Sequence, residues 1–191
     1  KLLADRKSPA EDRSRFIGIF EQVCQTLSYA HARGVIHRDL KPSNIMVGAF
    51  GEVQVMDWGL AKVLPSGGVA DEKKAQTKHK DVSVIETRRS SGSDVPGSAG
   101  SASSETKMGS VMGTPAYMPP EQARGDVASM DERSDVFALG AILCEILTGQ
   151  PPYVGAPEEL INMAAMCRLD DAHARLAACG AETAVVEIGR A

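Results

Sequence analysis

A polar loop at residues 37–44 carries side chains whose types and spacing suit chemistry on a phosphate group. Asp39 and Lys41 stand two residues apart in this loop. They combine a carboxylate that can orient a hydroxyl group and take its proton with an ammonium that can neutralise phosphate charge. Asn44 closes the loop, and Asp57 follows thirteen residues later. Phosphoryl transfer requires positioning, metal ions and charge compensation, and these residue types can supply all three.

Two oxygen ligands for a metal ion are expected at one end of a β-hairpin. Residues 45–47 and 53–56 are short apolar runs joined by Gly-Ala-Phe-Gly at 48–51, which predicts two strands and a turn. Asn44 enters this hairpin and Asp57 leaves it, so both lie at its open end, where cross-strand neighbours are about 5 Å apart. An amide oxygen and a carboxylate at that separation are hard ligands suited to Mg²⁺.

Helices are expected to position this loop and hairpin. Residues 14–33 carry apolar side chains at the i, i+3, i+4 spacing of an amphipathic helix. Residues 134–148 are apolar over most of the helix circumference, which predicts a buried central helix with Ser134 as its N-cap. Two further helices are expected at 157–167 and 182–190. The predicted fold is therefore mainly α with one small β-hairpin.

The segment 66–110 differs from the rest of the chain. It is rich in Ser, Gly, Lys and Thr and has few large apolar side chains. Such a composition cannot bury enough surface to offset the entropy lost on ordering. We therefore expect a disordered insertion that separates an ordered part at 1–65 from another at 111–191.

Composition excludes several classes of function. A net charge of -4 gives no basic footprint for nucleic acid or for an anionic membrane surface. No apolar run reaches the roughly 20 residues that a membrane-spanning helix needs. The cysteines contain no C-x-x-C pair, which predicts reduced, mostly buried thiols and neither disulfides nor a zinc site. They are Cys24, Cys144, Cys167 and Cys179.

Taken in order, the motifs resemble those of protein kinases. HRDLKPSN at 37–44 is similar to the kinase catalytic loop, and Asp57-Trp58-Gly59 resembles the metal-binding DFG motif. GTPAYMPPE at 113–121 resembles the end of an activation segment, and Asp135 lies in a stretch similar to the family's central-helix motif. The resemblance covers the chain outside the polar insertion. The amino-acid sequences of these motifs resemble those of bacterial kinases of the eukaryotic type.

The resemblance implies a serine/threonine protein kinase that uses ATP and Mg²⁺. Asp39 would be the catalytic base or the hydroxyl-orienting carboxylate, and Lys41 would contact the transferring phosphate of ATP. Asn44 and Asp57 would hold the magnesium ions. Lys41 favours serine and threonine over tyrosine as acceptors, and Thr114 would support that choice by bonding towards Asp39 and Lys41.

Other positions receive regulatory or structural roles from the resemblance. Arg38 would pair with a phosphate on the activation segment, carried by Ser110 or Thr106. The competing interpretations are a surface arginine and unmodified linker residues. His37 is expected to be structural and bonded to backbone. The further structural positions are Gly59, Glu121 and Asp135.

The sequence also departs from the family pattern. It contains no G-x-G-x-x-G loop, and residues 1–13 leave no room for the family's N-terminal lobe. We therefore expect a C-terminal lobe cut at both ends and inactive by itself, whose partners are the missing lobe of the same polypeptide, ATP and protein substrates. Glu121 would lack the arginine that pairs with it in the family, which is expected beyond Ala191. The expected compartment is the cytoplasm, either free or as the cytoplasmic part of a membrane-anchored kinase.

Two alternatives stay open. Small-molecule kinases of the aminoglycoside-phosphotransferase type resemble this chain in an H-x-D-x-x-x-x-N loop and a later Asp-Trp. Lys41 and the segment 113–121 argue against that class, because a platform for protein substrates has no use there. A non-catalytic, pseudokinase-like interaction module is the other alternative. The intact Asp39, Asn44 and Asp57 argue against it.

Overall fold

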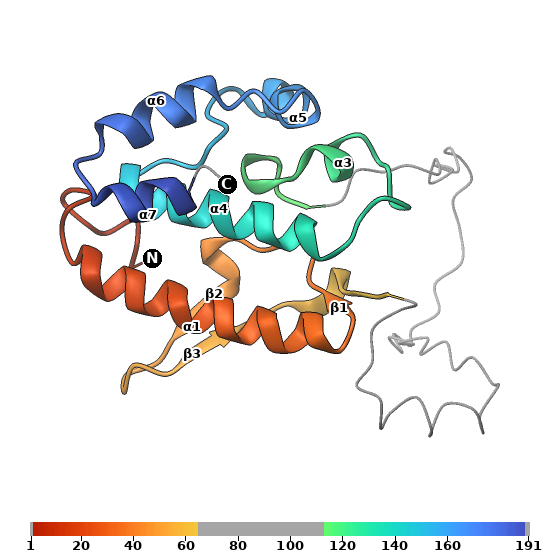
Figure 1. Ribbon diagram of the computed structural model, residues 1–191, viewed down its shortest axis with the longest axis horizontal. Coiled ribbons are helices and arrows are strands. Elements are labelled where there is room, and N and C mark those ends of the chain that lie inside the picture. Colours follow the sequence, from red (N-terminus) through yellow and green to blue (C-terminus); the bar gives the residue numbers. More distant parts are fainter. Residues whose placement is uncertain (1, 65–112, 190–191) are drawn as a thin grey trace, which may run out of the picture.

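The two longest helices of the described residues carry the main core in the computed structural model, which describes residues 2–64 and 113–189 (Figure 1). They are α1 (Arg13–Ala32) and α4 (Glu132–Thr148), and they pack side by side. The predicted insertion at 66–110, with Thr106 and Ser110, lies outside the described residues.

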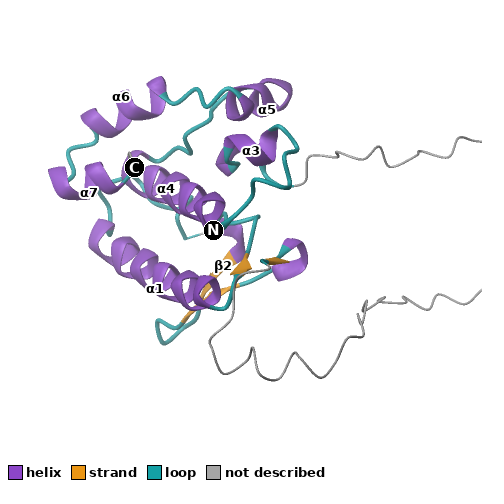
Figure 2. Ribbon diagram, turned by 45° about the vertical axis from the view of Figure 1, so that its right-hand side comes forward, coloured by secondary structure: helices purple, strands orange, loops and turns teal. Residues whose placement is uncertain are grey.

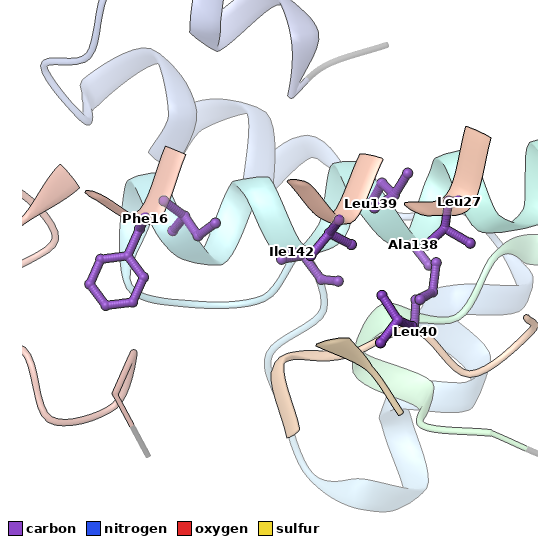
Figure 3. Packing of buried hydrophobic residues seen from close by; sticks show 9 residues of the cluster. Phe16, Leu27, Leu40, Ala138, Leu139 and Ile142 are labelled. Carbon is purple, nitrogen blue, oxygen red and sulfur yellow. The ribbon is translucent and has the colours of Figure 1, made fainter. Parts of the chain in front are cut away.

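The main core lies where α1 and α4 meet the polar loop. Leu27 of α1 is 1% exposed, and burying such a side chain contributes about 1.5–3 kcal/mol. Figure 3 shows this cluster with Phe16, Leu27, Leu40, Ala138, Leu139 and Ile142 labelled. Leu40 belongs to the loop that carries Asp39, so its burial in the core anchors that loop.

The helix α4 is the buried central helix that the sequence predicts, since ten of its 17 residues are buried. Its N-cap is Asp131, whose side chain accepts a hydrogen bond from the backbone N–H of Arg133. The prediction of Ser134 as N-cap is therefore wrong. Ser134 lies inside the first turn, where its hydroxyl donates to Glu121 (2.6 Å). The helix ends at Thr148, and the capping residue after it is Gly149, whose φ of 81° suits glycine.

The predicted hairpin is present as β2 (Ile45–Val47) and β3 (Val53–Val55), paired antiparallel with Met46 opposite Gln54. It packs against α1. A second two-stranded sheet, β1 (Val35–Ile36) with β4 (Lys62–Val63), was not predicted. Strands of two residues have no detectable alternation, and their pairing depends on tertiary contacts.

Figure 2 shows α4 between α1 and the helices that follow it in the chain. The predicted helices at 157–167 and 182–190 are present but shorter, as α5 (Pro157–Ala165) and α7 (Thr183–Ile188). The helix α6 (Asp170–Ala178) was not predicted, because it buries only Ala172 and Leu176 and so has a weak apolar pattern. The short elements not yet named are α3 (Pro120–Ala123) and the 3₁₀ turns η1 (Pro42–Asn44), η2 (Trp58–Leu60) and η3 (Pro115–Tyr117).

All four cysteines are free thiols, as predicted. The expectation that most are buried is wrong, because only Cys144 is buried and Cys167 is exposed. Cys167 lies in the turn that follows α5, with a φ of 51°. Among the helices at 2–64 and 113–189, none combines the length and the apolar character needed to cross a bilayer.

Candidate active site

Asp135 of α4 fixes the start of the polar loop. Its carboxylate is fully buried and accepts hydrogen bonds from the backbone N–H groups of His37 (2.8 Å) and Arg38 (2.9 Å). A third hydrogen bond links it to the ring of His31 (2.8 Å). A buried carboxylate requires such partners, because burial without them carries a large desolvation cost. The central helix therefore holds the loop by its backbone.

His37 joins the loop to the exit of the hairpin. Its Nε2 is 3.0 Å from the carbonyl oxygen of Met56, and its Nδ1 accepts from the backbone N–H of Asp39 (3.3 Å). Because a carbonyl oxygen can only accept, Nε2 is the donor in the bond to Met56. The ring also packs against Trp58, with 4.7 Å between centroids. These contacts give His37 the backbone bonds that the sequence analysis expected.

Two side chains of the polar loop meet a third from the segment 113–121. The Lys41 ammonium lies 2.7 Å from Asp39 Oδ2 and donates to Thr114 Oγ1 at 2.8 Å. The Thr114 hydroxyl in turn donates to Asp39 Oδ1 (3.3 Å). The Asp39 side chain is only 10% exposed, so its orientation is set by these partners and little by water. The fold thus brings together a carboxylate, an ammonium and a hydroxyl.

Asn44 and Asp57 lie at the open end of the hairpin, as predicted. The backbone oxygen of Asn44 accepts from Met56 N–H (2.7 Å), and Asp57 is the next residue. Asn44 Nδ2 donates to the backbone oxygen of Asp39 (2.8 Å), which leaves its amide oxygen as the atom able to bind a cation. That oxygen and the Asp57 carboxylate are a donor set that fits Mg²⁺.

Most ligands of a magnesium ion at this end of the hairpin would be phosphate oxygens and water molecules. Within the described ranges, no three His, Cys, Asp or Glu side chains form a metal-binding group. Mg²⁺ commonly binds through one or two protein ligands together with phosphates and water. Asp57 is exposed and has a left-handed backbone (φ 60°). A Cβ atom added at position 59, which is Gly59, would lie 3.2 Å from Oδ1 of Asp57.

The segment 113–121 packs onto α4 through two carboxylates. Glu121 accepts from Ser134 Oγ, so within this chain its carboxylate has a hydroxyl partner, and the expected arginine partner stays a prediction. Tyr117 donates its hydroxyl to Glu145 (2.6 Å). Burial raises the pKa of Glu145, and burial together with this hydrogen bond raises the pKa of Tyr117.

Arg38 and Gln122 complete the surroundings of the loop. The Arg38 Nε donates to the carbonyl oxygen of Leu60, and the phosphate partner expected for Arg38 would lie on residues outside the described ranges. Gln122 Nε2 donates to the backbone oxygen of Arg38 (2.8 Å). Sequence reasoning missed Gln122 and the Tyr117–Glu145 pair. Their partners are 84 and 28 residues away, so no local spacing could have indicated them.

Comparison with known proteins identifies the family. The family model described as "Protein kinase domain" matches residues 1–84 and 96–179. The serine/threonine-protein kinase PknB of Mycobacterium tuberculosis is 38% identical over 141 residues, which are 74% of this chain and 17% of that protein. PknD of Chlamydia caviae is 40% identical over 155 residues, 80% of this chain and 14% of that protein. The chain spans less than a fifth of the length of these relatives. It belongs to the protein kinase family, among the bacterial serine/threonine kinases of the eukaryotic type.

Proposed function

We propose that the natural polypeptide containing these residues transfers the γ-phosphate of ATP to serine or threonine hydroxyl groups of proteins. The observation that carries this proposal is the convergence of Asp39, Lys41 and Thr114. A carboxylate held by an ammonium and a hydroxyl can orient an attacking alcohol. The same ammonium can neutralise charge on the phosphoryl group in transit.

In the proposed reaction, the acceptor hydroxyl donates its hydrogen bond to Asp39. Its oxygen forms a bond to the γ-phosphorus as the bond from that phosphorus to the β,γ-bridging oxygen breaks, and ADP leaves. Asp39 takes the hydroxyl proton, while Lys41 stays close to the transferred group. Asn44 and Asp57 would hold Mg²⁺, which supplies charge neutralisation at the phosphates when bound. His37 and Asp135 keep the loop backbone in place.

We further propose that the described residues form the C-terminal lobe of a kinase domain, interrupted by an insertion at 66–110. The 191 residues contain no Gly-rich loop that could cover the phosphates of ATP. Because positioning is the main source of rate in phosphoryl transfer, we infer that the 191-residue chain alone is inactive. In this proposal, ATP takes most of its contacts from an N-terminal lobe of the same polypeptide.

The test uses the natural full-length polypeptide with labelled ATP, Mg²⁺ and a generic protein substrate. We expect Asp39→Asn to lower transfer by roughly 10²- to 10⁴-fold, because the variant cannot accept the proton. Asp5→Asn, the same change at an exposed position, should match the parent. Chelation of Mg²⁺ should stop transfer, and the label should appear on serine or threonine.

Four outcomes would contradict parts of the proposal. Equal transfer by Asp39→Asn and the parent would remove Asp39 from the reaction. Label on an aminoglycoside and none on protein would favour a small-molecule phosphotransferase, and no transfer at all would favour an interaction module. Robust transfer by the isolated 191-residue chain that disappears in Asp39→Asn would refute the inactivity of the chain alone.

A further inference from the structure

We propose that Gln122 is a positioning residue for Asp39, and that it couples the segment 113–121 to the polar loop. This inference rests on the proposed function and adds a residue to it. Gln122 lies on α3 and is 7% exposed. Its Nε2 donates to the backbone oxygen of Arg38 at 2.8 Å. It also lines a small cavity together with Asp39 and Thr114.

The hydrogen bond acts on the peptide unit that leads into Asp39. The carbonyl group of this unit belongs to Arg38 and accepts from Gln122, and its N–H group belongs to Asp39 and donates to His37 Nδ1 (3.3 Å). A peptide unit is planar, so holding its two polar groups fixes its rotation. That rotation determines the direction in which Asp39 leaves the backbone. Gln122 therefore helps to aim the carboxylate without touching the reacting atoms.

The backbone at this point needs such support. Arg38 has a φ of 69°, in the left-handed region that is unfavourable for a residue with a side chain. Conformations of this kind persist only where the surroundings fix them. The Arg38 N–H is held by Asp135, its Nε by the carbonyl of Leu60, and its carbonyl by Gln122.

The hydrogen bond also depends on the segment before α3. Gly113 has a φ of 124°, and a Cβ there would lie 2.7 Å from Gln122 Nε2 and 3.7 Å from the Arg38 oxygen. The glycine therefore leaves the room in which the amide meets the carbonyl. The next residue, Thr114, bonds to Asp39 and Lys41. The position of residues 113–114 and the position of the Gln122 amide therefore depend on each other. This dependence links the segment 113–121 to the polar loop.

The test compares two substitutions in the natural full-length polypeptide. Gln122→Met keeps the side-chain length and removes the donor, and Gln122→Glu replaces the donor with a carboxylate that faces the carbonyl. We expect each to lower kcat by about 10- to 100-fold, since small misplacements of a reacting group carry costs of that size. KM for ATP should stay unchanged. Gln25→Met and Gln25→Glu, on the exposed face of α1, serve as matched controls and should equal the parent.

A pH profile separates positioning from a purely structural role. A protonated glutamic acid can donate to the Arg38 carbonyl, whereas its carboxylate cannot. The ratio of kcat in Gln122→Glu to kcat in the parent should therefore rise as the pH is lowered from about 8 to about 6, because burial raises the pKa of carboxyl groups. The same ratio for Gln122→Met should stay flat over that range.

The outcomes distinguish this inference from the proposed function. A parent that transfers phosphate no better than Asp39→Asn overturns the proposed function, and this inference with it. An active parent whose kcat survives in Gln122→Met overturns only the role of Gln122. Failure of both Gln122 variants to fold would equally overturn it, because Gln122 would then serve stability. A melting temperature close to that of the parent, with the expected loss of kcat, supports it.

Discussion

At the scale of single residues, both oxygens of the Asp39 carboxylate have partners from this chain. Oδ2 accepts from Lys41 and from Asn44 (3.2 Å), and Oδ1 accepts from Thr114, which is 75 residues away. Such a carboxylate keeps its orientation before any substrate binds. Groups that are already oriented need no reorganisation during the reaction, which is why preorganisation lowers barriers. In the proposed reaction, Thr114 is a positioning residue for Asp39 and Lys41.

Thr114→Val should lower kcat for protein phosphorylation by about 10- to 150-fold, because a charge-assisted hydrogen bond contributes about 1.5–3 kcal/mol and valine has no hydroxyl. Thr114→Ser should restore most of the rate, since serine keeps the hydroxyl. Thr26→Val changes a threonine whose hydroxyl bonds only to the helix backbone at Gln22, and it should match the parent. Equal kcat for Thr114→Val and Thr114→Ser would exclude a role for the hydroxyl.

At the scale of elements, α4 combines a core helix with a polar attachment for the loop. Its first turn begins at Asp131, continues through Ser134, which holds Glu121, and reaches Asp135, which holds the loop backbone. Any fraying of this turn would release both attachments at once. The N-cap at Asp131 therefore contributes to the geometry of the site as well as to helix stability.

Asp131→Ala should lower the free energy of unfolding by about 1 kcal/mol, the usual loss for a removed N-cap. Asp131→Asn is the matched control: asparagine also caps well, so its stability should stay within about 0.5 kcal/mol of the parent. The ion pair of Asp131 with Arg133 should matter little, because the Arg133 side chain is 85% exposed. Denaturant unfolding measures both variants. A loss in Asp131→Asn equal to that in Asp131→Ala would assign the effect to the ion pair.

At the scale of the whole molecule, the end of α4 ties distant parts of the chain together. Arg6 donates to the carbonyl oxygen of Ile146 (3.0 Å) and stacks over Phe16, with 4.7 Å to the ring centroid. Glu145, one residue earlier, accepts the hydroxyl of Tyr117. The first residues of the chain, the segment 113–121 and the central helix therefore meet at one place. Because Glu145 is ionisable, it links the stability of the folded chain to pH.

Glu145→Gln should raise the melting temperature of the natural polypeptide at neutral pH. Burial raises the pKa of Glu145, so between its unfolded and folded pKa values the folded state binds more protons than the unfolded state. The free energy of unfolding therefore falls as the pH rises through that window. Glutamine does not ionise and can still accept from Tyr117.

Thermal unfolding at several pH values checks this prediction. The advantage of Glu145→Gln should shrink as the pH falls towards the range where glutamate is ordinarily protonated, because the parent then also carries a neutral group. Glu21→Gln makes the same change at an exposed position of α1 and should show no such trend. A Glu145→Gln variant less stable than the parent at neutral pH would contradict the sign.

The sequence by itself determined the elements whose patterns are local. The apolar spacing of 14–33 predicted α1, the apolar stretch at 134–148 predicted the buried α4, and two short runs around Gly-Ala-Phe-Gly predicted the hairpin. It also predicted that Asn44 and Asp57 share one end of that hairpin, since a hairpin fixes which residues face each other.

Only the tertiary structure decided which distant groups meet. It chose Asp131 over Ser134 as the cap of α4, placed Thr114 against Asp39 and Lys41, and brought Gln122 to the carbonyl of Arg38. The contacts of Thr114 and Gln122 join residues far apart in the chain, and they form only after helices pack and loops close. Their geometry depends on the packing of the whole core, which no short stretch of sequence encodes.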